Sequence, residues 1–214
     1  FNKNNITSDY IYIISNAYSE ANEEVYKIIL NDFEYYYYHD FIGKILEKEI
    51  IAISGTHGKT TTSSMAAHLL HQSHVGCDAF LGGISKNYGT NLLLSDTSEY
   101  VVIEADEFDR SFHWLTPYAT VITATDADHL DIYGTEEAYL ESFNHYTSLI
   151  QPGGALIMRK GIKLQPRLQE GVTCYTYSRE GGDFHAENVR IGGGEIFFDY
   201  VSPLGNIPDI RLGV

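Results

Sequence analysis

The sequence predicts an α/β fold, a mostly parallel sheet flanked by helices, and three observations support this prediction. From Glu49 onward, short apolar segments alternate with segments of helical length and spacing. This alternation is typical of parallel strands whose two faces are covered by helices. A glycine-containing turn joins the first apolar segment to a helix, and polar clusters follow two later apolar segments. Around residues 184–200, a glycine-rich pattern predicts an antiparallel hairpin at the edge of the sheet.

Residues 1–43 are predicted to form a strand–helix–strand unit, the tail of a domain that precedes the main sheet. Strands are expected over residues 10–15 and 33–38, with a helix over 20–31 between them and a short helix over 41–47 after them. The first helix is indicated by Val25, Ile28 and Ile29, which share one face at helical spacing. We therefore expect a first domain over residues 1–43 and a second over residues 44–214.

The main sheet is predicted from the segments that begin at Glu49. Strands are expected over residues 49–54, 100–105, 118–124, 154–158 and 172–177, and helices over residues 59–74, 136–149 and 161–170. Thr135 is the predicted N-cap of the helix over 136–149, because a threonine hydroxyl accepts a hydrogen bond from a free N–H group of the first turn. The pair Gly82-Gly83 and the segment 87–91 are predicted as turns.

The turn between the first strand and helix of the main sheet predicts a phosphate-binding loop. Its members are Gly55, Thr56, His57, Gly58, Lys59, Thr60 and Thr61. N–H groups at a helix start have no intrahelical partners and bind phosphate oxygens. Lys59 would reach the terminal phosphates of a nucleotide, and the Thr60 hydroxyl would bind Mg²⁺. Ile53 stands where the common Gly-x-x-x-x-Gly-Lys-Ser/Thr pattern has its first glycine, so a glycine-rich turn without a nucleotide stays an alternative.

Two polar clusters follow predicted strands, over residues 104–109 and 126–131. Ligands of open parallel sheets collect at the carboxyl ends of the strands. Glu104 is the predicted Mg²⁺ ligand because it is the first acid beyond its strand, and His129 is the second candidate. A solvated acidic loop would explain either cluster alone, but their joint position downstream of the phosphate loop favours a metal and nucleotide site.

Composition limits the partners and the compartment. The chain of 214 residues has 29 acidic against 14 basic residues and a net charge of −15, which argues against a nucleic acid or an anionic membrane as partner. Cys77 and Cys174 are its two cysteines and no CxxC motif occurs, which favours a reducing, cytoplasmic location. No feature of the sequence predicts an oligomeric state.

His68, His71 and His74 recur along a predicted helix, where a solvent-facing polar stripe is favoured over a metal site.

Three segments, in this order, resemble the Mur ligases, the family that builds the peptide stem of bacterial peptidoglycan. They are residues 55–62, 104–112 and 128–134. The resemblance implies that residues 45–214 are the central ATP-binding domain of this family. Residues 1–43 would then be the end of its Rossmann-like N-terminal domain, which binds the UDP substrate. The C-terminal domain of the family is expected to be absent from this chain, which we interpret as an internal piece of a longer protein.

Within the family, two features are most similar to the members that add L-alanine to UDP-N-acetylmuramate. They are His57 before the second loop glycine and the run Asp109-Arg110-Ser111-Phe112. Phe143 also stands where several sister ligases have a carbamylated lysine. The resemblance implies that ATP converts the muramoyl carboxylate to an acyl phosphate, which the amine of L-alanine then attacks. It assigns catalysis to Lys59, Glu104 and His129, and Mg²⁺ binding to Thr60, Glu104 and His129.

Three alternatives remain open at this point. A ligase that attaches a whole tripeptide to UDP-N-acetylmuramate shares the loop, and residues 15–19 resemble its N-terminal domain, although residues 109–112 differ from the expected run. A P-loop NTPase would hydrolyse nucleotide without ligation. A non-catalytic nucleotide-binding module is disfavoured, because the candidate site residues are all present: Lys59, Thr60, Glu104 and His129.

Overall fold

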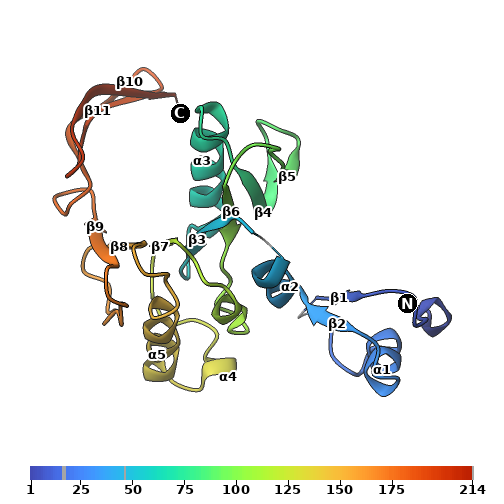
Figure 1. Ribbon diagram of the computed structural model, residues 1–214. Coiled ribbons are helices and arrows are strands. Elements are labelled where there is room, and N and C mark those ends of the chain that lie inside the picture. The colour runs from blue at the N-terminus through green and yellow to red at the C-terminus, as the bar shows by residue number, and fades with distance from the viewer. Residues whose placement is uncertain (16–17, 46, 214) are drawn as a thin grey trace.

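A computed structural model describes residues 1–15, 18–45 and 47–213 and contains a seven-stranded sheet with the order β5-β4-β6-β3-β7-β8-β9 (Figure 1). Its strands are β3 (Glu49–Ser54), β4 (Asp78–Ser85), β5 (Thr90–Leu93), β6 (Tyr100–Glu104), β7 (Ala119–Ile122), β8 (Ala155–Arg159) and β9 (Thr173–Tyr177). β5 pairs antiparallel with β4, and the other pairs of this sheet are parallel. The mostly parallel sheet predicted from the sequence is therefore confirmed.

Helices cover both faces of this sheet. They are α3 (Lys59–Gln72) on one face and α5 (Glu136–Thr147) on the other, with the short α4 (Leu130–Tyr133) and the 3-10 helix η2 (Ser111–Trp114) on the side of α5. Thr135 caps α5 as predicted, since its hydroxyl accepts the N–H of Ala138 at 3.1 Å. Among the described residues, no helix has the length and apolar character needed to cross a membrane.

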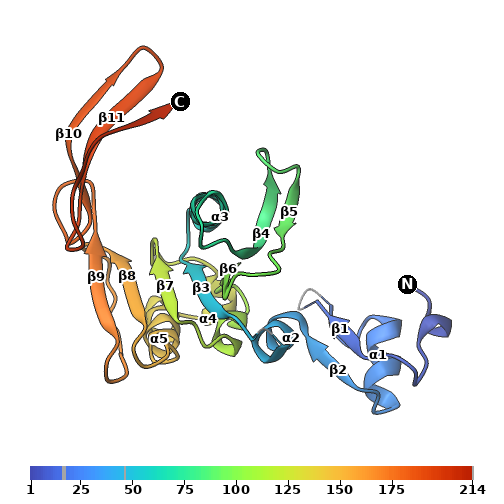
Figure 2. The ribbon, with the colours of Figure 1, turned by 45° about the horizontal axis from the view of Figure 1, so that its top comes forward.

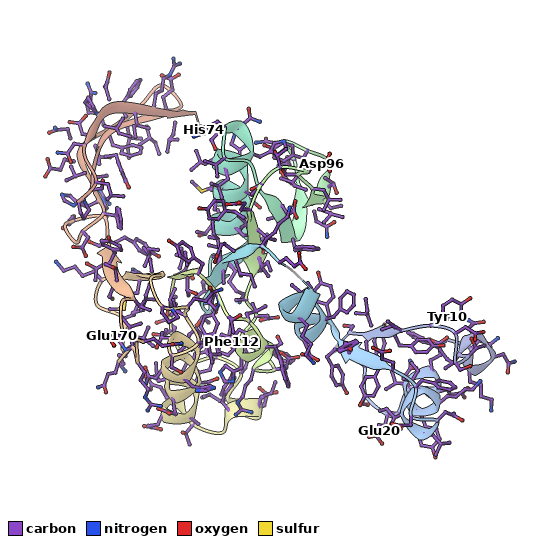
Figure 3. The ribbon with its side chains drawn as sticks, in the orientation of Figure 1. Tyr10, Glu20, His74, Asp96, Phe112 and Glu170 are labelled. Carbon is purple, nitrogen blue, oxygen red and sulfur yellow. The ribbon has the colours of Figure 1, made fainter. Side chains whose placement is uncertain are left out.

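Two hydrophobic cores result from the alternation of side chains along the strands. Val101 and Ile103 of β6 belong to the core on the side of α5, where Phe112, labelled in Figure 3, stacks on Tyr146 with the ring centroids 4.5 Å apart. Val102 points to the opposite face and belongs to the core that contains Ala67 of α3. β6 is therefore buried on both sides, as a central parallel strand should be.

The N-terminal residues form a separate small unit with its own core. It contains η1 (Lys3–Asn5), β1 (Tyr12–Ile14), α1 (Glu23–Leu30) and β2 (Tyr35–Tyr37), and α2 (Tyr38–Ile45) follows it. β1 and β2 are parallel, so the strand–helix–strand unit predicted from the sequence is present. The predicted domain boundary after residue 43 falls inside α2, and the division into two domains stays a prediction. In the segment 15–19, Asn16 and Ala17 lie outside the described residues.

The predicted hairpin over 184–200 is present, but it belongs to a second sheet. β10 (His185–Gly192), β11 (Glu195–Val201) and β12 (Ile207–Gly213) form an antiparallel three-stranded sheet that projects away from the large one (Figure 2). Gly193 and Gly194 have φ of +62° and +78°, the left-handed conformation that a two-residue hairpin turn requires. The antiparallel edge of the large sheet is instead the hairpin of β4 and β5.

Two sequence predictions were wrong in the main sheet. No helix forms over residues 161–170, because Pro166 lacks an N–H group and the N–H groups of its neighbours bond to α5 instead. Gln165 donates to Asn144 Oδ1 at 2.9 Å and Arg167 donates to Thr147 Oγ1 at 2.8 Å. Residues 82–83, predicted as a turn, lie inside β4.

Candidate active site

The phosphate-binding loop predicted from the sequence connects the end of β3 to the start of α3. Gly58 is the N-cap of α3 with φ +85°, and its carbonyl accepts the N–H of Thr62 at 2.9 Å. Gly55 has φ +122°, and a Cβ atom there would lie 2.4 Å from Thr123 Oγ1 and 2.8 Å from Ala124 N. Gly55 is therefore needed both for its backbone conformation and for the close approach of the segment after β7.

Hydrogen bonds hold this loop against the residues that follow β7. The N–H of Thr56 donates to the carbonyl of Ala124 at 3.1 Å, and its hydroxyl donates to the carbonyl of Asp126 at 2.8 Å. Thr123 donates to the carbonyl of His57, whose side chain is exposed. The phosphate loop and the Asp-His segment, far apart in sequence, therefore meet at one end of the sheet.

Glu104 ends β6 beside the first turn of α3. Its carboxylate accepts hydrogen bonds from Thr60 Oγ1 at 3.0 Å, Ser63 Oγ at 2.8 Å and the N–H of Gly82 at 2.7 Å. A Cβ atom on Gly82 would lie 2.5 Å from a carboxylate oxygen of Glu104, so a larger residue at this point of β4 would displace that carboxylate. The hydroxyl and carboxylate oxygens of Thr60 and Glu104 are ligands that Mg²⁺ prefers. Sequence reasoning missed Gly82 and Ser63 as neighbours of Glu104.

Lys59 is paired with a buried glutamate that sequence reasoning also missed. Its Nζ lies 3.0 Å and 2.9 Å from the two carboxylate oxygens of Glu107 and 3.0 Å from the carbonyl of Gly55. Glu107 is completely buried, and Tyr133 donates a hydrogen bond to its carbonyl. Burial raises the pKa of the Glu107 carboxyl, and the Lys59 ammonium acts in the opposite direction. The signal available in the sequence was its place in the same acidic cluster as Glu104.

His129 immediately precedes α4, and among the described residues no hydrogen bond joins it to Lys59 or Glu104. It is the N-cap of α4 with φ +54°, and its ring packs edge-on against Phe108 with the centroids 4.8 Å apart. The loop over 106–108 therefore lies between Lys59 and His129, because Glu107 contacts Lys59 and Phe108 contacts His129. The role of His129 as a metal ligand stays a prediction.

His68 and His71 lie on α3, which ends at Gln72, and His74 follows it. His68 is half-buried and its Nδ1 lies 2.8 Å from the hydroxyl of Tyr88, whereas His71 and His74 are exposed. Within the part of the chain that the structure describes, no group of three or more His, Cys, Asp or Glu residues could hold a metal ion. A Mg²⁺ ion in this site would therefore depend on few protein ligands and on the phosphates of a nucleotide.

Comparison with known proteins identifies the kind of domain that this chain resembles. The family described as the Mur ligase middle domain matches residues 53–211. The UDP-N-acetylmuramate–L-alanine ligase of Phocaeicola vulgatus is 83% identical over 164 residues, which are 77% of this chain and 36% of that protein. The enzyme of the same name from Parabacteroides distasonis is 57% identical over 208 residues, or 96% of this chain and 45% of that protein. The chain thus spans less than half the length of these relatives.

Solved structures support the same fold. A UDP-N-acetylmuramate–alanine ligase from Thermotoga maritima superposes with a TM-score of 0.77 at 24% identity, over 95% of this chain and 46% of that one. A Neisseria ligase that joins UDP-N-acetylmuramate to L-alanyl-γ-D-glutamyl-meso-diaminopimelate has the same TM-score at 22% identity, over 92% of this chain and 65% of that one. At these identities the superpositions establish the fold alone.

Proposed function

Because the chain belongs to the Mur ligase family, we propose that the protein is an ATP-dependent ligase that joins L-alanine to UDP-N-acetylmuramate in peptidoglycan synthesis. The Mg²⁺ and nucleotide site of this proposal rests on the contact between Thr60 and Glu104 at the start of α3, beside the phosphate loop. The ligase activity rests on the match to the Mur ligase middle domain over residues 53–211. The choice of L-alanine rests on the relatives of that name at 83% and 57% identity. An activity that uses ATP and a UDP-sugar fits a cytoplasmic enzyme.

The proposed reaction has two steps. The muramoyl carboxylate attacks the γ-phosphorus of ATP, so that the bond to ADP breaks and an acyl phosphate forms. The amine of L-alanine then attacks the acyl carbon, phosphate leaves, and the amide forms with loss of a proton from the amine. In phosphoryl transfer the protein mainly positions the reactants and neutralises charge.

The loop residues named above would bind the phosphates of ATP. Free N–H groups at the start of α3 would donate hydrogen bonds to the phosphate oxygens, and Lys59 would neutralise charge near the γ-phosphate. Thr60 and Glu104 would hold one Mg²⁺, whose charge offsets that of the phosphates; their oxygens, 3.0 Å apart, fit such a role. His129 is proposed for the second ion, next to the muramoyl carboxylate.

The test is a ligation assay of the full-length protein with ATP, Mg²⁺, UDP-N-acetylmuramate and a panel of acceptors. We expect ADP release that depends on L-alanine. Release with the tripeptide L-alanyl-γ-D-glutamyl-meso-diaminopimelate alone would instead favour the recycling ligase, whose fold superposes equally well. Release that needs neither acceptor would identify an NTPase without ligase activity.

Lys59→Ala should abolish ligation, because the loss of one electrostatic contact to the reacting phosphate costs about 10²–10³ in rate. Lys163→Ala is a matched control, since Lys163 is 75% exposed and its ion pair with Glu136 lies on the surface. Near-normal turnover by Lys59→Ala would contradict the assignment.

A further inference from the structure

Glu107 has the properties of a residue retained for its charge. Its side chain is 1% exposed, yet it carries a carboxylate, and both oxygens lie within hydrogen-bond distance of Lys59 Nζ. Removing an ion from water is costly, so a buried carboxylate requires a charged partner and good geometry. The half-exposed Asp106 is a poorer partner for the lysine, because its nearest oxygen lies 3.9 Å from Nζ.

The pair also fixes the position of the lysine. A lysine side chain is flexible, but here its ammonium is held between Glu107 and the carbonyl of Gly55 at 3.0 Å. The lysine side chain remains 19% exposed. Part of the side chain therefore stays accessible to a ligand bound at the phosphate loop.

We propose that Glu107 is a positioning residue that holds Lys59 at the phosphate loop before and during nucleotide binding. The proposal rests on the proposed function, in which Lys59 meets the phosphates of ATP. Were Lys59 to leave Glu107 for a phosphate, a completely buried carboxylate would lose its partner, which is strongly unfavourable. The ion pair therefore persists when nucleotide binds, and the lysine contacts the phosphate from this fixed position.

Tyr133 extends this arrangement to the Asp-His segment. Its hydroxyl, on the last residue of α4, donates to the backbone carbonyl of Glu107. Its ring also lies under the guanidinium of Arg110, 4.6 Å from the centroid. Tyr133 thus fixes the backbone from which the Glu107 side chain reaches Lys59.

The experiment is a double-mutant cycle of Lys59→Ala and Glu107→Gln in the full-length protein. Glu107→Gln keeps the shape and removes the charge, so ATP affinity should change less than about threefold. Its kcat should fall about 10- to 100-fold, because the lysine is present but no longer held. In the Lys59→Ala background, Glu107→Gln should leave ATP affinity unchanged and raise the unfolding temperature, since it neutralises an unpaired buried charge.

Equal changes of the unfolding temperature on Glu107→Gln in the wild-type and Lys59→Ala backgrounds, or an unchanged kcat in the wild-type background, would overturn the proposal. Glu99→Gln is the matched control, because Glu99 is exposed and precedes β6 at the end opposite to Glu104. If Glu107→Gln does not fold, Tyr133→Phe is the second test, because it removes the hydrogen bond to the Glu107 carbonyl. It should also lower kcat, at unchanged ATP affinity. Failure of the wild type to ligate L-alanine would refute the proposed function, whereas the cycle of unfolding temperatures would still decide whether Glu107 and Lys59 are coupled.

Discussion

The two glycines of the phosphate loop allow a quantitative test of how this loop is packed. Both have positive φ, +122° at Gly55 and +85° at Gly58. A Cβ atom on Gly55 would lie 2.4 Å from Thr123 Oγ1 and 2.8 Å from both the N and the O of Ala124, whereas a Cβ atom on Gly58 would meet no atom within 4 Å. Alanine at these positions therefore separates backbone strain from steric overlap.

The expected costs follow from these contacts. At Gly58 the methyl group enters open space, so Gly58→Ala should cost only the left-handed backbone, about 1–2 kcal/mol. At Gly55 the backbone conformation costs about 1–3 kcal/mol, and a methyl group forced into filled space adds about 1–3 kcal/mol. The atoms that Gly55→Ala would meet include backbone N and O of Ala124, which cannot turn away as a flexible side chain would. Gly55→Ala should therefore lower the free energy of unfolding by about 2–6 kcal/mol in total, whereas Gly58→Ala should lower it by about 1–2 kcal/mol.

Urea denaturation of the full-length protein and both variants measures these free energies of unfolding. The slope of the unfolding free energy against urea concentration should be the same for all three proteins, so a change in the midpoint reports a change in stability. Equal losses for the two variants, or a larger loss for Gly58→Ala, would refute the reasoning. Either result would mean that the segment after β7 does not pack on Gly55.

Two further predictions concern Glu104 and the pH dependence of stability. Gly82→Ala should displace the Glu104 carboxylate and so raise the Mg²⁺ concentration needed for ADP release. Gly83→Ala is the control and should have a smaller effect, because its Cβ would lie 3.3 Å from Thr60 Cγ2. Equal Mg²⁺ requirements of the two variants would contradict this prediction. Burial lowers the pKa of His113 below its usual 6.5, so the unfolded chain binds its proton more readily and stability should fall as pH drops below about 6.5. In urea midpoints measured from pH 7 to pH 5, His113→Gln should show a shallower fall than the wild type, and an identical fall would be inconsistent with this origin.

Local patterns were sufficient to predict most of the large sheet. The strand over 49–54, the helix that begins at Lys59 and the cap at Thr135 depend on residues close in sequence, and each was found where expected. The strand–turn–helix geometry of the phosphate loop was predictable for the same reason, since Gly55, Gly58 and Lys59 are close in sequence. Phosphate binding by this loop stays a prediction.

Features that depend on distant residues were not predictable in this way. The segment 161–170 has helical spacing, but the N–H groups of Gln165 and Arg167 bond to side chains of α5. Gly82 was taken for a turn residue because a glycine pair usually marks one, whereas here it leaves room for the carboxylate of Glu104. Glu107 could not be distinguished from its acidic neighbours, because its burial and its pairing with Lys59 appear only when β6 lies beside β3.

The order of the strands explains why three motifs far apart in sequence act at one place. β3 lies between β6 and β7, so the phosphate loop, the acidic loop and the Asp-His segment leave the sheet from adjacent strand ends. Hydrogen bonds then connect each of these three segments to the other two. Lys59 binds Glu107, whose backbone accepts a hydrogen bond from Tyr133, and Thr56 returns the connection to Asp126. A shift of one segment must therefore strain the other two, and under the proposed function this coupling would keep Lys59 in place while a nucleotide is bound.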